Sequence, residues 1–141
     1  MITLTRMIYR SRATSPEVMD LLALSEILGV SRRNNPRRSL TGMLLARDGW
    51  FVQALEGQAA HIDLLMRDLE RDTRHRDIEV LSSEPATERV FGDWSMAQAR
   101  ITPAVRERLV GVSLEAVSAD EALSLMQACE PLGTKAVAAE A

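Results

Sequence analysis

The sequence predicts an α+β fold in which a β-sheet carries two helices on one face and a C-terminal helical cap. The first observation is the order of the apolar patterns, which alternate between strand and helix periods as β-α-β-β-α-β-β. The second is that each predicted helix has one apolar stripe. Both helices can therefore pack on the same side of an antiparallel or mixed sheet, as in the ferredoxin-like arrangement. The third is size, because 141 residues with 46% hydrophobic content suit one domain with a substantial core.

The first two predicted elements are a strand and a helix. Ile2–Tyr9 is rich in residues that favour strands. Ser15 can cap the N-terminus of a helix, with Pro16 at its first position. Apolar residues then recur at helical spacing as far as Leu28. The helix should end near Asn34-Asn35, since the residue before a proline avoids the α region.

The middle of the chain predicts a hairpin, a second helix and two further strands. Leu40–Ala46 and Trp50–Glu56 flank Asp48-Gly49, which is typical of a two-residue hairpin turn. A helical stripe follows and ends in the charged run Arg71–His75; its apolar members are Ile62, Leu65, Met66 and Leu69. The remaining strands are predicted at Ile78–Leu81 and Trp94–Ile101.

The C-terminal segment predicts two short helices that cover the second face of the sheet. Thr102-Pro103 starts one, which runs to about Val110, and Ser118 with Glu121 has the spacing of a capping box for the other, which runs to about Glu130. Pro131-Leu132-Gly133 should end that helix, and the alanine-rich terminus should fray. We therefore expect the sheet and its two helices at 1–101 and a helical cap and tail at 102–141.

Composition and charge argue against several classes of partner. The formal net charge is −3, whereas a nucleic-acid-binding domain normally has a basic excess. The single cysteine, Cys129, excludes an internal disulfide, as is common in a reducing compartment. No apolar run approaches the 18 or so residues of a membrane-spanning helix. We expect a cytoplasmic protein that binds neither nucleic acid nor membrane.

The usual signatures of enzymes are missing from the sequence. His61, His75 and Cys129 do not have the spacing of zinc ligands. No phosphate-binding glycine loop and no nucleophile elbow are present. The acidic residues are scattered along helix surfaces, so no pair of carboxylates is directed into one cleft. General acid–base hydrolysis therefore has no support.

Three polar positions are unusual for their places in the pattern. Tyr9 is the only tyrosine and ends the first predicted strand. Gln53 lies in the middle of a strand between Phe51 and Leu55, which places it on an apolar face where its amide needs a partner. Asn34-Asn35 lies where the first helix ends and could present an amide to a planar ligand. Taken singly, Tyr9 is more often a core or interface tyrosine, Gln53 more often faces solvent on an edge strand, and Asn34-Asn35 more often ends a helix in a turn.

Taken together and in order, these residues resemble a BLUF domain, the flavin-binding blue-light sensor module. The resemblance covers roughly residues 2–101 and is of the short, single-domain class. The strings F-x-Q-x-L-E-G and F-x-x-W-S-M are its more specific parts. The matching segments are Tyr9-Arg10-Ser11, Ser31–Asn35, Leu40-Thr41-Gly42, Phe51–Gly57, Arg71–His75 and Arg89–Met96.

The resemblance implies a bound flavin (FAD in the first place, FMN or riboflavin otherwise) held between the two helices and the sheet. Asn35 would bind the ring edge at its C4 carbonyl, with Asn34 and Ser31 as weaker candidates. Ile27 and Leu69 would flank the two ring faces. Further along the cofactor, Arg74 and His75 would lie toward the ribityl or phosphate end. In the family pattern Tyr9 and Gln53 are photoactive, and Trp94 and Met96 relay the signal.

The implied function is a light sensor and not an enzyme. Light would drive transient electron and proton transfer from Tyr9 to the flavin, and recombination would leave the Gln53 amide rotated or tautomerised. Because an amide has one donor end and one acceptor end, its orientation is a two-state variable. The signal would pass along the fifth strand to the C-terminal helices and from there to an unidentified protein partner. We also expect the chain to form a homo-oligomer. The alternatives are a flavin-free interaction module of the same fold and a small acylphosphatase-like hydrolase.

Overall fold

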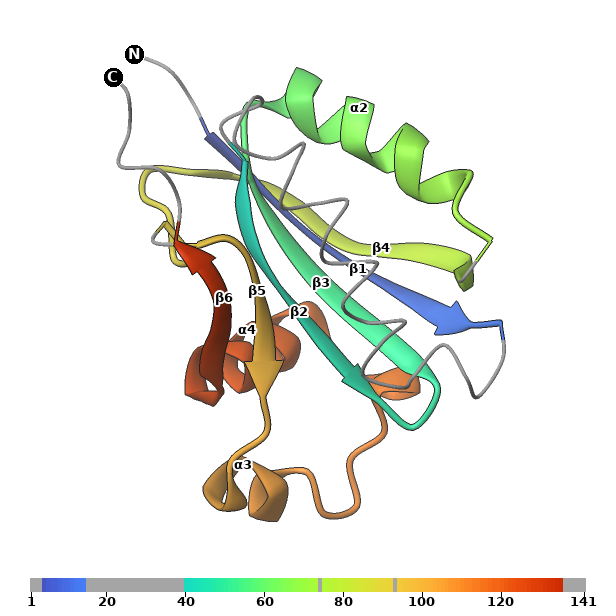
Figure 1. The fold of residues 1–141 in the computed structure, drawn as a ribbon, viewed down its shortest axis with the longest axis vertical. Helices are drawn as coiled ribbons and strands as arrows, with labels where there is room; N and C mark the ends of the chain where they lie inside the picture. The colour runs from blue at the N-terminus through green and yellow to red at the C-terminus, as the bar shows by residue number, and fades with distance from the viewer. Residues whose placement is uncertain (1–3, 15–39, 74, 93, 136–141) are drawn as a thin grey trace.

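The structure is a computed structural model that describes residues 4–14, 40–73, 75–92 and 94–135. It contains a six-stranded sheet with the strand order β4-β1-β3-β2-β5-β6 (Figure 1). The strands are β1 (Leu4–Ala13), β2 (Thr41–Arg47), β3 (Trp50–Gly57), β4 (His75–Ala86), β5 (Trp94–Arg100) and β6 (Glu130–Lys135). The helices are α2 (Ala59–Glu70), α3 (Pro103–Arg108), the short 3-10 turn η3 (Leu114–Ala116) and α4 (Ala119–Ala128).

The strand pairing confirms the predicted α+β, ferredoxin-like class. β1 lies between β3 and β4 and is antiparallel to both, and β2 is antiparallel to β3. β5 then joins β2 in parallel, as expected for strands joined by a crossover. The helix predicted from Pro16 to Asn34 lies outside the described residues.

The predicted hairpin is confirmed in detail. Arg47 and Trp50 are paired, so Asp48 and Gly49 alone form the turn between β2 and β3. Both have positive φ, 52° and 85°. This is the backbone of a type I′ turn, whose twist matches that of the two strands.

Each face of the sheet has its own core. Along β3, Phe51 and Leu55 pack with the buried residues of α2, whereas Val52 and Ala54 pack with those of α3, η3 and α4. This follows from the two-residue period of a strand. Figure 1 shows α2 and α4 on opposite sides of the sheet. The second face is therefore covered by the C-terminal helices, as the sequence predicts.

The caps of the two C-terminal helices also follow the prediction. The Thr102 hydroxyl accepts a hydrogen bond from the Val105 amide at the start of α3, with Pro103 at the first position. The Ser118 hydroxyl accepts one from the Glu121 amide at the start of α4. Both helices end before the predicted limit, at Arg108 and Ala128.

The helix ends before Pro131-Leu132-Gly133 as predicted, but the sequence did not predict the strand that follows it. These residues belong to β6, which pairs antiparallel with β5. Proline is tolerated there because β6 is an edge strand, where a missing amide donor need not break a ladder. β4 is also much longer than Ile78–Leu81, since its polar ends are held by pairing with β1 and not by their own apolar pattern.

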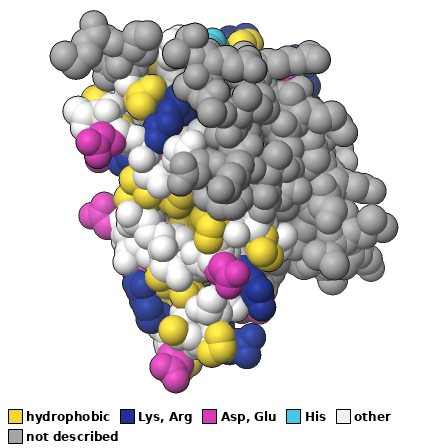
Figure 2. Space-filling model, turned by 60° about the vertical axis from the view of Figure 1, so that its left-hand side comes forward, with side chains coloured by type: hydrophobic (Ala, Val, Ile, Leu, Met, Phe, Trp, Pro, Cys, Tyr) yellow, Lys and Arg dark blue, Asp and Glu magenta, His cyan; other side chains and the backbone are white. Residues whose placement is uncertain are grey.

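None of the helices that the structure describes has the length and apolarity needed to cross a bilayer. Over the described part of the face in Figure 2, acidic and basic side chains are interspersed with hydrophobic ones. Neither sign of charge therefore dominates that part of the surface.

Candidate functional site

The centre of the site is a buried pair formed by Tyr9 and Gln53. They are direct partners across the β1–β3 ladder, so both side chains project from the same face, the one covered by α2. Each is 2% exposed. The Tyr9 hydroxyl donates a hydrogen bond to Oε1 of Gln53. The sequence predicts that a buried Gln53 amide needs a hydrogen-bond partner, and the Tyr9 hydroxyl is that partner for its oxygen.

The other end of the Gln53 amide contacts β5. Its Nε2 donates to the sulfur of Met96 at 3.2 Å. A Cβ at Gly42 would lie 3.1 Å from the terminal methyl of Met96 and would collide with the Ala54 carbonyl, so only glycine fits beside this contact. A thioether is a weak acceptor, so the donor end of the amide is held less firmly than its oxygen. Three strands are thereby joined in a series from phenol to amide to sulfur.

The phenol of Tyr9 is held in its neutral form. Burial raises the pKa of Tyr9 far above its ordinary value, and the negative charge of Asp72 adds to this effect. The proton on the hydroxyl is therefore retained in the native protein across the physiological pH range, where it donates to Gln53.

The raised pKa of Tyr9 predicts a loss of stability at alkaline pH. An unfolded tyrosine loses its proton at about pH 10. The native phenol keeps it there, so the unfolded state binds fewer protons and the free energy of unfolding falls as the pH rises past about 10. Because Tyr9 is the only tyrosine, tyrosinate absorption reports this group alone. In an alkaline titration that absorption should appear together with loss of far-ultraviolet circular dichroism; its appearance in the folded protein would contradict the buried placement.

A pocket opens beside the pair under the C-terminal end of α2. Its described lining is Tyr9, Leu44, Phe51, Leu69, Asp72 and His75. The ring centroids of Phe51 and His75 are 6.4 Å apart in an edge-on arrangement. The lining thus combines flat and apolar groups with one phenol, one imidazole and one carboxylate. These side chains form a small pocket whose polar groups suit contact with one edge of a planar heteroaromatic ring.

Both ring nitrogens of His75 are engaged by protein groups. Nε2 lies 2.7 Å from the carbonyl oxygen of Leu69, which can only accept, so Nε2 carries a hydrogen. Nδ1 lies 2.8 Å from the hydroxyl of Ser11, which donates to it when the ring is neutral. His75 therefore ties the start of β4 to the last turn of α2 and to β1, and its ring forms part of the pocket wall.

The structure brings together five of the predicted site residues, namely Tyr9, Gln53, Leu69, His75 and Met96. Ile27, Ser31, Asn34, Asn35 and Arg74 lie outside the described residues. Trp94 begins β5, and only its backbone is described. Sequence reasoning missed Asp72 and Ser11 as site residues. Both lie within strings that resemble the family, and that was the signal that could have identified them.

Comparison with known proteins identifies the family. The family model described as "BLUF: Sensors of blue-light using FAD" matches residues 4–97. The photoactivated adenylate cyclase subunit beta of Euglena gracilis is 40% identical over 99 residues, which cover 69% of this chain and 11% of that protein. The chain thus spans about a tenth of the length of this curated relative.

Two solved structures have the same fold. The dark state of BlrB, a BLUF protein, has a TM-score of 0.75 and 32% identity and covers 91% of this chain and 98% of that chain. The ground state of BlsA has a TM-score of 0.82 over 96% of this chain and 95% of that chain, at 22% identity, which supports the fold alone.

The family match spans every described wall of the pocket, from Tyr9 on β1 to His75 on β4. The chain therefore belongs to the BLUF family, sensors of blue light that use FAD.

Proposed function

We propose that this protein is a blue-light photoreceptor that binds its flavin, FAD in the first place, in the pocket beneath α2. The observation that carries the proposal is the buried hydrogen-bonded series Tyr9, Gln53 and Met96 next to that pocket. A hydrogen bond from the amide to a thioether adds little stability, because sulfur is a weak acceptor. A weak acceptor does suit an amide that must change partners during the photocycle.

The remaining walls of the flavin site are proposed from the family pattern. Leu69, which lines the pocket, would flank one face of the ring. Ile27 would flank the other, and Asn35, with Asn34 and Ser31, would hold the C4 carbonyl edge. Toward the ribityl chain we propose Arg74 and His75. A hydrogen bond from His75 to the cofactor would require exchange of one of its present partners, of which Ser11 is the more easily turned because its hydroxyl rotates.

When bound, the flavin supplies the light-absorbing group and the transient electron acceptor. Tyr9 supplies the electron, and a phenol that has lost an electron is a strong acid. Its proton therefore leaves along the existing hydrogen bond toward Oε1 of Gln53. Electron and proton both return to Tyr9 on recombination, so no net oxidation or reduction results. Gln53 would be left with its amide turned or tautomerised, and in either form the hydrogen bond from Nε2 to the sulfur of Met96 would be altered.

The change at Gln53 would reach the C-terminal cap, residues 102–141, through β5. Loss of the contact between Nε2 and sulfur would change the packing of Met96 on β5, and that strand leads directly to Pro103 and α3. The cap is also joined to the sensor strands by arginines: Arg47 donates to the carbonyl of Leu109, and Arg10, next to Tyr9, donates to those of Leu114 and Val117. Binding of a downstream protein partner and self-association of the chain are predicted from the sequence.

The decisive experiment is reconstitution and illumination. The purified chain is incubated with FAD, FMN or riboflavin in parallel, freed of excess flavin and exposed to blue light. We expect a yellow protein whose absorption shifts reversibly to the red, with FAD retained best. A chain that stays colourless with all three flavins would support the flavin-free interaction module. A yellow protein with no light-induced shift would contradict the photoreceptor assignment.

A further inference from the structure

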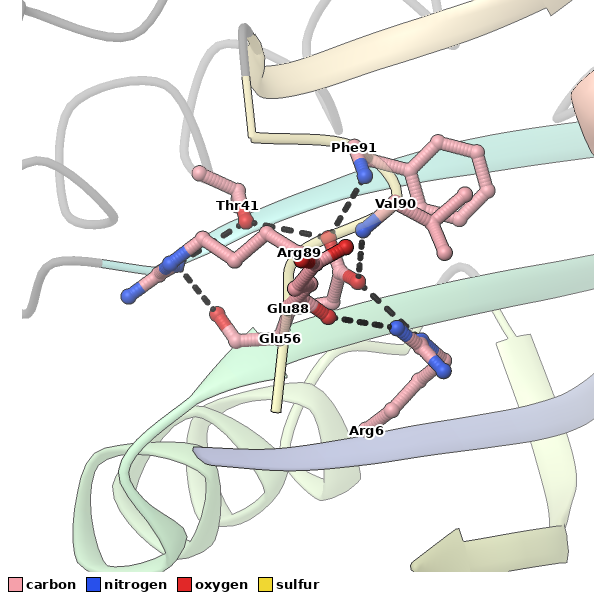
Figure 3. Close-up of polar contacts among 7 residues, drawn as sticks. All are labelled: Arg6, Thr41, Glu56, Glu88, Arg89, Val90 and Phe91. Carbon is pink, nitrogen blue, oxygen red and sulfur yellow. Dashed lines mark hydrogen bonds and ion pairs between the residues drawn. The ribbon is translucent and has the colours of Figure 1, made fainter. Parts of the chain in front are cut away.

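A second buried polar group lies on the opposite face of β3 from Gln53. Glu56 is 1% exposed and follows Gln53 by three residues, so its side chain points toward the C-terminal cap. Its Oε2 accepts hydrogen bonds from Nε of Arg6 at 3.0 Å and the amide of Val90 at 2.6 Å (Figure 3). Its Oε1 accepts from the amide of Phe91 at 2.7 Å and the hydroxyl of Thr41 at 3.2 Å.

The groups around the Glu56 side chain all donate to it. A buried ionised carboxylate is tolerated only when its lone pairs are satisfied in this way, and such charge-assisted bonds are roughly twice as strong as neutral ones. Arg89 extends the network, since its Nη1 donates to the Thr41 hydroxyl and to the Glu56 backbone carbonyl, each at 2.9 Å. Arg6 also donates to the Glu88 carbonyl at 2.8 Å. We call these residues the Glu56 cluster: Arg6, Thr41, Glu56, Glu88, Arg89, Val90 and Phe91.

The Glu56 cluster fixes the segment that leads into β5. Every residue from 88 to 91 takes part in it, and β5 begins at Trp94. Phe91 is 4% exposed and belongs to the same core cluster as Met126 of α4. The cluster therefore holds the segment before β5 against β1, β2 and β3. Within β5, whose backbone pairs with β2 and β6, the Met96 side chain accepts the weak hydrogen bond from Gln53.

The geometry points to Glu56 as a positioning residue that keeps the start of β5 stationary, so that loss of the hydrogen bond between Gln53 and Met96 displaces the far end of the strand and α3. This inference rests on the proposed light-driven change at Gln53 and adds the direction in which that change travels. The physical reason is the contrast between the two attachments. Four hydrogen bonds to the buried Glu56 carboxylate resist displacement, whereas the hydrogen bond from the Gln53 amide to the Met96 sulfur is weak and is the one that the proposed change at Gln53 breaks.

The test compares amide hydrogen exchange in the dark and under blue light for the full flavin-loaded chain and its Glu56→Gln variant. Glutamine has the same size, but in either orientation its amide nitrogen would face a backbone donor, that of Val90 or that of Phe91. Glu84→Gln, an exposed carboxylate on β4, is the matched control. In the unchanged protein and the control, we expect a light-induced difference from residue 96 onward and none at 88–92. In Glu56→Gln, the red shift should persist, a difference should appear at 88–92, and that at 103–117 should fall by about twofold or more.

Each outcome decides the inference. A Glu56→Gln variant that keeps the red shift and has the exchange pattern of the unchanged protein would overturn the role of Glu56 and leave the photoreceptor intact. Absence of a red shift in the unchanged protein would overturn both. If Glu56→Gln does not fold, Thr41→Val is read by the same criteria, since it removes one Glu56 donor and one Arg89 acceptor while keeping the shape of the side chain.

Discussion

Tyr9→Phe is expected to retain flavin and to lose the light-induced red shift completely. The substitution removes one hydroxyl from a side chain that is almost fully buried, so the wall of the pocket keeps its shape. It also removes the group that supplies both the electron and the proton. The Gln53 oxygen loses its partner, which should lower the free energy of unfolding by about 1–3 kcal/mol. The measurement is the absorption spectrum before and during blue light, with bound flavin quantified after denaturation.

The matched control for Tyr9→Phe is Ser124→Ala. This substitution removes a hydroxyl from the exposed surface of α4, where it accepts from Arg108, and it should leave flavin content and red shift unchanged. A normal, reversible shift in Tyr9→Phe would eliminate Tyr9 as the electron donor, because the variant contains no tyrosine at all.

Gln53→Leu is expected to abolish the red shift by a different route. Leucine is close to glutamine in size and suits the apolar face beside Phe51 and Leu55, so flavin should still bind. It has no amide to exchange partners, and it removes both the acceptor of the Tyr9 proton and the contact to Met96. Electron loss from Tyr9 can still occur, since the phenol is intact. Transient absorption should therefore detect oxidised Tyr9 in this variant and not in Tyr9→Phe, while neither variant gives the lasting shift.

Gln127→Leu provides the comparison for Gln53→Leu. The same replacement is made at an exposed position on α4, away from the pocket beneath α2, and the photocycle should be unaffected. An undiminished red shift in Gln53→Leu would show that the amide is not the switching group, whatever the behaviour of Tyr9.

Much of the local structure follows from short stretches of sequence. The alternation of Phe51, Gln53 and Leu55 correctly placed the glutamine on an apolar face, because neighbours two apart on a strand share a face. Asp48-Gly49 correctly predicted the turn, and Thr102 and Ser118 correctly predicted the helix starts. Each of these depends on interactions among residues within a few positions of one another.

The sequence by itself determined the fold class, the two-sided sheet and the presence of a polar pair on its α2 face. Only the tertiary structure decided that Tyr9 lies directly opposite Gln53, that Met96 takes the other end of the amide, and that Glu56 holds residues 88–91. It also decided that β6 is a strand, since a segment containing Pro131 has little strand propensity and is extended through its pairing with β5. The physical reason is the same throughout. These contacts join residues 30 or more positions apart, and their energies depend on strand register and burial, which no local pattern of residue types specifies.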